Sequence, residues 1–378
     1  MNHPYTGIGQ YTQHLLAAMA KQDPSISWMV PVPEPVSPSI KLPKSVHIHV
    51  LPEFTSIPSS LSKWLWEQVQ VPRFFARHNL DLIHYPYPAN PRYKSRVPSL
   101  VTVHDIIPWK RPEYRTKLRS RLYHHHAQRA LLKAEEIIAV SQTTAFDLSD
   151  HLDYPFDHIK IIHEAASPHF GFKKGKFKHS KPYFLYVGGY DPRKNVTRLI
   201  EAYQEYIAPK YDVDLILMGA KKAQKDLKNG TSRLISPLPE STINVSHPGQ
   251  IILTDSLSAD DLARYYRGAL AFVNVSLAEG FNLPLLESAA CGTPILTSDL
   301  PIHREIVQDH GRFCDPKQTK SIGKMLLHFL QNQTLQSDLR DHAAHLATQY
   351  SWEKAATQTL EFYRSLPLNH GKLTSRRH

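Results

Sequence analysis

Two glutamates, Glu279 and Glu287, lie eight residues apart and flank a turn that starts at Gly280. The apolar run 269–275 precedes them and predicts a buried strand. Pro284 has the fixed φ angle that suits a first helical turn, so we expect Glu279 on a strand-to-helix loop and Glu287 on the helix. Free N–H groups at a helix start favour phosphate, and carboxylates accept hydrogen bonds from hydroxyl groups. Phosphate and hydroxyl groups together describe a nucleotide sugar.

A second group of candidate residues follows another predicted strand, 183–187. Arg193 and Lys194 come shortly after the glycines at the end of that strand, and Asn195 is a plausible cap for the helix that follows. A nucleotide diphosphate leaving group gains negative charge as its bond to the sugar breaks. Metal-dependent enzymes stabilise that charge with a cation held by carboxylates. Fixed side-chain cations beside a helix N-terminus do the same electrostatic work.

These residues need elements that bring them together, and the chain supplies alternating strands and helices. In the first half we expect helices at 9–21, 118–133 and 143–152, and strands at 46–51, 80–84, 99–104, 136–141 and 159–163. In the second half we expect helices at 196–206, 259–267 and within 322–366, and strands at 183–187, 214–218, 250–253, 271–275 and 294–297. The alternation predicts an α/β fold with parallel sheets covered by helices on both faces. Two doubly wound, Rossmann-like domains would face each other across a cleft.

Composition breaks suggest where the domains begin and end. We expect an N-terminal domain on the acceptor side over 1–168, a linker over 169–182, and a nucleotide-sugar-binding domain over 183–350. A last helix, 351–368, would pack back on the N-terminal domain, and the tail 369–378 would be disordered. The chain opens on glycines at positions 7 and 9 with no room for a strand before them. Either the first sheet lacks its usual first strand, or the chain start lies upstream.

Composition and charge exclude several classes of protein. Of the 378 residues, 41% are hydrophobic and 21% charged, which is typical of globular domains. The two cysteines, Cys291 and Cys314, have no metal-ligand spacing and fit a reducing cytosol. No apolar run of about 18 residues predicts a membrane span, and no secretion signal opens the chain. The net charge of +11 is uneven, with 22 Lys and Arg against 14 Asp and Glu in residues 1–180. That surface suits anionic membrane lipid or an anionic acceptor, whereas no motif supports nucleic-acid binding.

Taken together, these segments resemble the family 4 retaining glycosyltransferases of the GT-B fold, and among them the bacterial mannosyltransferase-type members. The resemblance runs from Gly7 to about Leu366 and rests on segments 279–287, 186–195 and 102–105, with weaker support from 7–11, 140–141 and 350–352. It implies retaining transfer of a sugar from a nucleotide diphosphate sugar to an acceptor hydroxyl, with no metal and no cofactor. The family usually has glycine where Asn282 stands, and often has an arginine where Gly189 stands.

The resemblance also implies roles for individual residues. The catalytic candidates are His104, which would approach the transferred sugar or acceptor, and Glu279, which would face the sugar without acting as a nucleophile. The donor-binding candidates, with Glu287 on the ribose and Lys194 on the phosphate, are Arg193, Lys194, Gly280, Phe281, Asn282, Leu283 and Glu287. The candidates for a loop at the acceptor or diphosphate are Gly7, Gly9 and Asp105. No residue is assigned to a metal.

The function that follows is hexose transfer, with GDP-mannose as the first donor, to a glycan or lipid-linked glycan in cell-surface polysaccharide synthesis. The protein would be cytoplasmic, with peripheral contact at the inner membrane face through the basic N-terminal domain. The alternative is a non-catalytic relative that binds nucleotide sugar or glycan. An epimerase or phosphorylase of the same fold is a third hypothesis, although no segment resembles a pyridoxal-binding lysine site. A basic nucleic-acid binder is the least supported.

Overall fold

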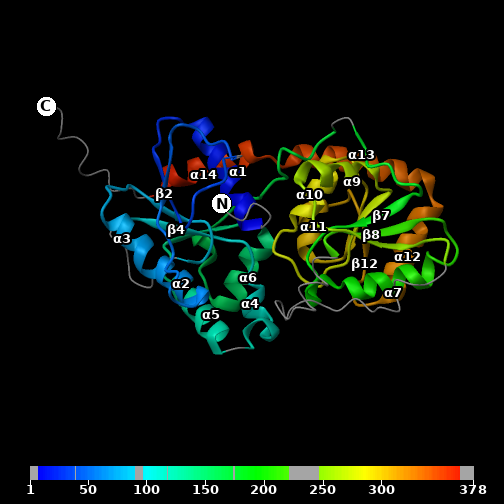
Figure 1. The fold of residues 1–378 in the computed structure, drawn as a ribbon, viewed down its shortest axis with the longest axis horizontal. Coiled ribbons are helices and arrows are strands. Elements are labelled where there is room, and N and C mark those ends of the chain that lie inside the picture. Colours follow the sequence, from blue (N-terminus) through cyan, green and yellow to red (C-terminus); the bar gives the residue numbers. More distant parts are fainter. Residues whose placement is uncertain are drawn as a thin grey trace. The chain divides into compact units, whose positions relative to one another are not determined.

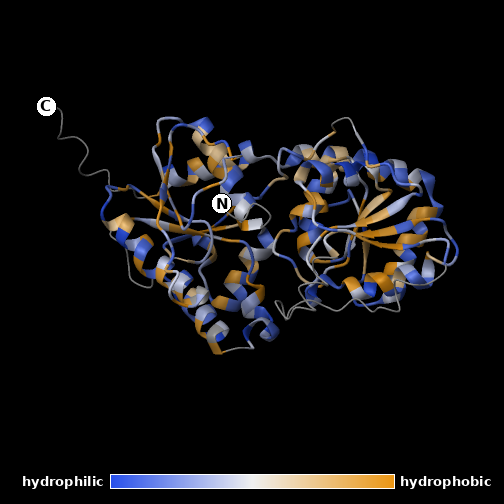
Figure 2. Ribbon diagram, viewed as in Figure 1, coloured by the Kyte–Doolittle hydropathy of each residue, from blue (hydrophilic) through white to orange (hydrophobic). Residues whose placement is uncertain are grey.

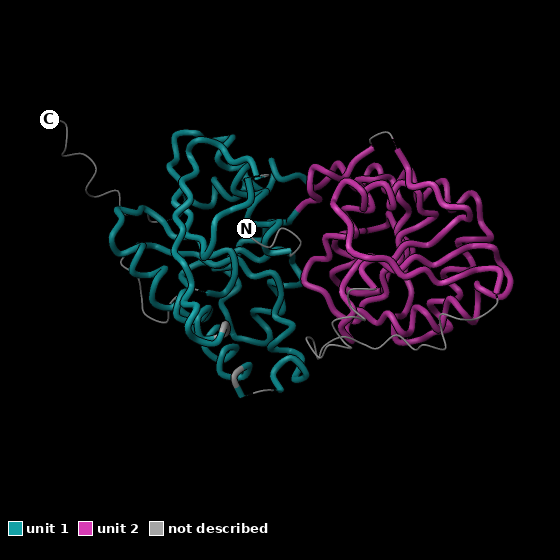
Figure 3. Tube along the Cα trace, in the orientation of Figure 1, with its two compact units in different colours: residues 1–164, 351–378 teal, residues 165–350 magenta. Residues whose placement is uncertain are grey.

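The chain folds into two compact units, which Figure 3 colours separately. The computed structural model describes residues 7–38, 40–89, 97–116, 118–172, 175–220 and 247–366. The N-terminal unit consists of Met1–Glu164 with Ser351–His378, and the C-terminal unit is Ala165–Tyr350. Within the described ranges, no helix is both long enough and apolar enough to cross a membrane. The tail predicted to be disordered, 369–378, lies outside the described residues.

A six-stranded parallel sheet forms the centre of the C-terminal unit, in the order β12-β11-β10-β7-β8-β9. Its strands are β7 (Tyr183–Tyr186), β8 (Asp214–Leu217), β9 (Ile251–Leu253), β10 (Ala271–Asn274), β11 (Ile295–Ser298) and β12 (Arg312–Cys314). The chain starts in the middle, runs outward through β8 and β9, returns to β10 and runs outward the other way. In this doubly wound order, ligands bind where the direction reverses. The reversal here lies between β7 and β10, and the predicted parallel architecture is confirmed.

The central strands form because each contains a short apolar run, with polar residues only at the strand ends. Every residue of β7, β8, β10 and β11 is buried, as expected for parallel strands covered on both faces. Figure 2 shows these strands as a hydrophobic centre beneath more hydrophilic outer surfaces. The buried carboxylate of Asp214 is accommodated because it pairs with His179 at 2.7 Å and accepts from the backbone N–H of Gln250 at 2.9 Å.

Helices cover both faces of this sheet, with α7 and α12 on one face and α9 and α10 on the other (Figure 1). The helices are α7 (Val196–Tyr206), α9 (Ala259–Gly268), α10 (Leu283–Ala290), α11 (Pro301–Val307), α12 (Thr319–Gln331) and α13 (Gln333–Gln349). Side-chain caps start two of them, since Ser258 accepts from the N–H of Asp261 at 3.2 Å and Asn332 from that of Leu335 at 2.9 Å. The stretch predicted to be helical, 322–366, is thus divided among α12, α13 and a later helix.

The N-terminal unit divides its strands between two parallel sheets. One pairs β1 (Trp28–Val32) with β2 (Val46–Val50); the other has the order β3-β4-β5-β6. The strands of the second sheet are β3 (Ile83–Tyr85), β4 (Ser99–Val103), β5 (Glu136–Ala139) and β6 (Ile159–Ile161). A doubly wound sheet would place one more strand between β1 and β3, and no described residue fills that position. The ring of Tyr363 lies near both sheets. Its centroid is 6.3 Å from that of Trp28 in β1 and 5.7 Å from that of His84 in β3.

The last helix, α14 (Trp352–Ser365), belongs to the N-terminal unit although it follows the C-terminal unit in sequence. It packs along α1 (Gly7–Gln22), where the Gln22 amide donates to the carbonyl of Glu353 at 2.7 Å. The aromatic ring of Trp352 lies 6.1 Å from that of Tyr11. The other helical elements of this unit are α2 (Ser59–Leu65), a π-helix (Trp66–Gln70), α3 (Val71–Ala76), α4 (Ile107–Lys110), a 3-10 turn (Pro112–Arg115), α5 (Leu118–Leu131), α6 (Gln142–Leu152) and a second 3-10 turn (Phe156–His158).

Candidate functional site

The reversal of strand order in the C-terminal unit brings two strand-to-helix loops together. The loop after β7 leads through a 3-10 turn (Pro192–Lys194) to α7, and the loop after β10 leads to α10. A backbone hydrogen bond joins the loops directly, because the N–H of Leu277 donates to the carbonyl of Arg193 at 2.7 Å. The cationic segment and the first glutamate, which are far apart in sequence, therefore lie side by side at the point where doubly wound sheets bind ligands.

Asn195 fastens the same two loops with its side chain. Its amide nitrogen donates to the carbonyls of Val275 at 3.0 Å and of Pro316 at 2.7 Å. Asn195 stands at the N-cap position of α7 in a left-handed conformation, with φ of 58°. The predicted N-cap position is therefore confirmed, although the side chain forms no capping hydrogen bond there. The amide instead serves the packing of three loops at the carboxyl edge of the sheet.

Glu279 forms ion pairs with both predicted phosphate-binding cations. Its carboxylate lies 2.6 Å from Nη1 of Arg193 and 2.6 Å from Nζ of Lys194. The Ser276 hydroxyl also donates to it, at 2.7 Å. Burial alone would raise the pKa of Glu279, but Lys194 and Arg193 lower that pKa to about 2. Arg193 also pairs through Nε with the carboxylate of Asp191 at 3.3 Å, so the two cations lie between two carboxylates.

Glu287, on α10, is also buried, but its surroundings raise its pKa, whereas those of Glu279 lower it. The residue is 5% exposed, and the hydroxyl of Tyr266 on α9 donates to its carboxyl group at 3.1 Å. Burial raises the pKa of Glu287 to about 7, against a small lowering by that hydrogen bond. Its carboxyl group therefore holds a proton over much of the pH range in which Glu279 is ionised.

The turn between the two glutamates ends at Asn282, which is left-handed with φ of 77° and ψ of 63°. Non-glycine residues seldom adopt this conformation, and asparagine is one of the few that tolerate it. The turn leads into α10, whose eight residues make about two turns. Phe281, Asn282 and Leu283, all predicted donor-binding residues, are less than 9% exposed.

His303, on α11, holds the side chain of Asn282. The ring is fully buried, and burial lowers the pKa of His303 to about 4, so the imidazole is neutral. Its Nδ1 lies 3.0 Å from the carbonyl of Ser298, which only accepts, so this nitrogen carries the hydrogen. Its Nε2 then accepts from the amide of Asn282 at 2.9 Å. The amide oxygen of Asn282 is buried and has no hydrogen-bond partner among the described residues.

In the N-terminal unit, both ring nitrogens of His104 face acceptors. Nδ1 lies 2.8 Å from the carboxylate of Glu164, and Nε2 lies 2.9 Å from the carbonyl of Pro86. An ionised carboxylate and a carbonyl only accept, so this geometry fits a ring protonated on both nitrogens. Burial would lower the pKa of His104, but the hydrogen bond and charge of Glu164 raise it overall. The ring of Tyr11 packs edge-on against His104 at 4.8 Å.

The other three predicted residues of this unit have clear structural positions. The carboxylate of Asp105 accepts from the N–H of Ile107 at 2.9 Å, at the entry to α4. Gly7 and Gly9 lie in the first turns of α1. The prediction of a glycine loop before the helix is therefore wrong, because the helix starts at Gly7, two residues earlier than expected.

Sequence reasoning missed the residues that hold the candidate side chains in place: Glu164, Tyr266, Ser276 and His303. Glu164 carried a usable signal, since it follows a predicted strand at the same sheet edge as His104. The other three had no signal in a single sequence. Throughout the described ranges, no group of His, Cys, Asp and Glu side chains could hold a metal ion.

We expect Glu287→Gln to stabilise the protein at pH 8 and to have little effect near pH 4.5. The pKa of Glu287 is about 7 in the folded state, above its value in the unfolded chain. As the pH rises from the unfolded-state pKa to the folded-state pKa, the buried carboxyl group therefore lowers the free energy of unfolding. The penalty reaches about 3 kcal/mol above the folded-state pKa. Chemical unfolding across this pH range measures it, with Glu361→Gln on the exposed surface of α14 as control. An equal effect at both pH values would contradict the assignment.

We expect His303→Leu to be costly only while position 282 is asparagine. Without the imidazole, the buried amide of Asn282 loses its one partner, at a cost of about 1–3 kcal/mol. Glycine at position 282 accepts the left-handed backbone and has no amide to satisfy. Unfolding of the wild type, His303→Leu, Asn282→Gly and the double variant should therefore give a coupling of about 1 kcal/mol or more. Additive effects would show that His303 does not act through Asn282.

Comparison with known proteins agrees with this architecture. Residues 5–169 match the model of Glycosyltransferase Family 4, and residues 170–346 match that of Glycosyl transferases group 1. The chain is 29% identical to the O-antigen chain mannosyltransferase B of Escherichia coli over 278 residues, which cover 71% of this chain and 70% of that protein.

Two solved structures have the same fold. Sucrose-phosphate synthase from Thermosynechococcus elongatus superposes with a TM-score of 0.71 and 19% identity, covering 95% of this chain and 93% of that one. Anabaena HepE in complex with UDP and glucose superposes with a TM-score of 0.67 and 17% identity, covering 97% of this chain and 98% of that one. The two family matches meet near the boundary between the units and together span almost the whole described chain. The protein therefore belongs to the family 4 glycosyltransferases and has the GT-B fold.

Proposed function

We propose that this glycosyltransferase transfers mannose from GDP-mannose to a hydroxyl group of a glycan or lipid-linked glycan, with retention of configuration. The observation that carries the proposal is the cluster that Arg193 and Lys194 form with Glu279 at the strand reversal. Nucleotide-sugar chemistry is supported by the fold shared with a protein solved with UDP and glucose. Mannose is supported by the likeness to an O-antigen mannosyltransferase.

In this proposal, the cluster binds the diphosphate of the donor. Arg193 and Lys194 are 20% and 11% exposed, so their charged groups remain partly accessible although both contact Glu279. As the bond from the sugar carbon to the phosphate oxygen breaks, the growing negative charge on the phosphate is stabilised by these fixed cations. The acceptor oxygen bonds to the same carbon from the same face, and its proton passes to the leaving phosphate. No protein nucleophile, metal ion or other cofactor is required.

The two glutamates take different parts in donor binding. Glu287 would accept hydrogen bonds from the ribose hydroxyl groups, and the turn from Gly280 to Leu283 would bind the hexose. Glu279 already has three partners in this structure. We propose that it positions the two cations and faces the sugar with what remains of its hydrogen-bonding capacity. Ion pairing fixes the cations before the donor arrives, which lowers the cost of organising the site.

We propose that His104 acts as a fixed positive charge and not as a base. Glu164 and the carbonyl of Pro86 together favour the doubly protonated ring, and a ring in that state has no lone pair with which to accept a proton. Because these two partners use both N–H groups, the charge would act through space and stabilise negative charge on the substrate.

The acceptor side is proposed to lie in the N-terminal unit, with peripheral contact to anionic membrane lipid. Leu118 and Leu122, one turn apart on α5, are 72% and 51% exposed. The same segment is basic, as residues 109–128 contain six Lys and Arg and one Glu. Exposed leucines beside basic residues are typical of surfaces that lie on anionic bilayers.

We expect Lys194→Ala to lower transfer of labelled mannose from GDP-mannose by about 100-fold, the usual cost of removing one group that stabilises leaving-group charge. The matched control is Lys181→Ala in the same unit, because Lys181 forms an exposed pair with Asp212 at 2.9 Å. Transfer is measured from GDP-mannose and UDP-glucose in parallel. Equal turnover by the Lys194 variant and the wild type would reject the phosphate assignment, and faster transfer from UDP-glucose would reject the donor.

We expect Glu164→Gln to lower the pKa of His104. The raised pKa keeps the ring protonated at pH values where an ordinary histidine is neutral, and the carboxylate is the main source of that rise. The titration midpoint of His104, followed by NMR and identified with a His104→Asn variant, should move to lower pH. The alkaline decline of transfer should move with it. Glu136→Gln is the control, since Glu136 faces the exposed His158 at 3.2 Å. If the titration midpoint of His104 stayed the same in Glu164→Gln, Glu164 would not be the source of the raised pKa of His104.

A further inference from the structure

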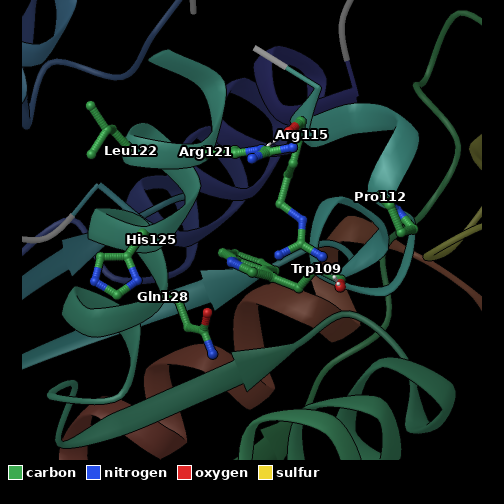
Figure 4. A pocket seen from close by; sticks show the side chains of 7 residues that line it. All are labelled: Trp109, Pro112, Arg115, Arg121, Leu122, His125 and Gln128. Carbon is green, nitrogen blue, oxygen red and sulfur yellow. Dashed lines mark hydrogen bonds between the residues drawn. The ribbon is translucent and has the colours of Figure 1, made fainter. Parts of the chain in front are cut away.

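A pocket in the N-terminal unit lies within the basic segment 109–128 and is lined by none of the candidate donor-binding or catalytic residues. Its volume is about 500 Å³, within the range typical of small-molecule sites. The wall is built from α4, the 3-10 turn that follows it, and α5 (Figure 4), and the residues that line it are Trp109, Pro112, Arg115, Arg121, Leu122, His125 and Gln128. Figure 4 shows the guanidinium group of Arg115 next to the indole of Trp109.

Three hydrogen bonds to backbone carbonyls fix the main side chains of the pocket. The indole nitrogen of Trp109 donates to the carbonyl of His124 at 3.0 Å. Arg115 donates through Nη2 to the carbonyl of Trp109 at 2.9 Å, and Arg121 donates through Nε to the carbonyl of Arg115 at 2.9 Å. The aromatic ring and the two guanidinium groups are therefore held in place by the chain itself. Side chains held in this way are organised before a ligand binds.

Among the described residues, no acidic side chain lines the wall of this pocket, and the nearest acidic residue in sequence, Glu113, pairs with Arg111 at 3.1 Å. Nε of Arg115 is buried and has no hydrogen-bond partner among the described residues. Each guanidinium group has five N–H donors, and the bonds above use one from each. Burial and the charge of Arg115 together lower the pKa of the neighbouring His124, which reflects the same excess of positive charge.

We propose that this pocket binds a phosphate ester carried by the acceptor saccharide. Guanidinium groups match the oxygens of phosphate in charge and in fork geometry. The flat indole of Trp109, with Leu122 beside it, provides an apolar surface for the C–H face of a sugar ring, and Gln128 and His125 can hydrogen-bond its hydroxyl groups.

The position of the pocket fits this ligand. Its first element, α4, begins two residues after Asp105, at the carboxyl end of β4 where His104 also lies. A phosphate in the pocket would therefore hold a saccharide at the edge of the sheet that carries the candidate acceptor-side residues. The proposal rests on the proposed function only in taking the acceptor to be a glycan.

The test uses the full chain labelled with 5-fluorotryptophan and observed by ¹⁹F NMR, with the Trp109 signal assigned from a Trp109→Phe variant. We expect mannose 6-phosphate to shift the Trp109 signal saturably, inorganic phosphate to do so at least tenfold more weakly, and mannose to have no effect. The donor site is monitored in the same samples by the thermal shift with GDP, so a failure of the donor assignment is distinguished from a failure of this one.

Two variants and one control locate the binding. Arg121→Gln and His125→Gln should each weaken binding of mannose 6-phosphate at least tenfold, with the GDP thermal shift unchanged. Arg111→Gln removes the same charge from the neighbouring segment and should bind normally, because its partner is Glu113 outside the pocket wall. An equal loss in all three variants would show only general attraction to a basic surface and would overturn the proposal.

Other ligands are excluded by parallel titrations. A Trp109 shift with vesicles that contain phosphatidylglycerol, and none with mannose 6-phosphate, would assign the pocket to a lipid head group and overturn the saccharide proposal. Displacement of mannose 6-phosphate by such vesicles, after both have shifted the signal, would support the phosphate chemistry. A shift at lower concentrations of GDP than of mannose 6-phosphate would make it a nucleotide site. If mannose and mannose 6-phosphate shifted the Trp109 signal equally, the arginines would not bind the phosphate, and the proposal would be overturned.

Discussion

The buried ion pairs of Glu279 with Lys194 and Arg193 are the interaction on which the candidate site of the C-terminal unit depends. A carboxylate this deeply buried is tolerated only because both cations and the Ser276 hydroxyl surround it. The same contacts tie the loop after β7 to the loop after β10, across the reversal of the sheet. One set of charges thus fixes the local fold, and in the function proposed above the same charges would stabilise the leaving phosphate.

Two buried glutamates of the candidate site have pKa values that their surroundings shift in opposite directions. Two cations lower the pKa of Glu279, whereas burial raises the pKa of Glu287, which has a tyrosine hydroxyl beside it. A third carboxylate, Glu164, acts on another residue, since it raises the pKa of His104. Burial acts in the same direction on Glu279 and Glu287, and the difference between them comes from the cations that the fold places against Glu279. A donor that brings its own charges and hydroxyl groups changes each of these balances at once.

Much of the fold was predictable from sequence because the buried parallel strands contain short continuous apolar runs. The strands that escaped prediction lack this signature: β1 contains Pro31 and is only partly buried, and β12 is three residues long with an exposed arginine. The proximity of the cationic segment to Glu279 followed from the rule that carboxyl ends of parallel strands share an edge. Their direct pairing did not follow, because sequence gives positions along strands and not the directions of side chains. The contact between His303 and Asn282 depends on how α11 packs, which no local pattern encodes.

The return of the chain to the N-terminal unit at Ser351 has a consequence for engineering. Because α14 completes the packing against α1, the N-terminal unit is assembled from two separate stretches of sequence. The C-terminal unit, by contrast, is an uninterrupted insert. A chimera that exchanges the C-terminal unit between relatives should therefore replace an internal segment and leave the terminal helix native. A simple fusion of one protein's first half to another's second half would pair α1 with a foreign α14.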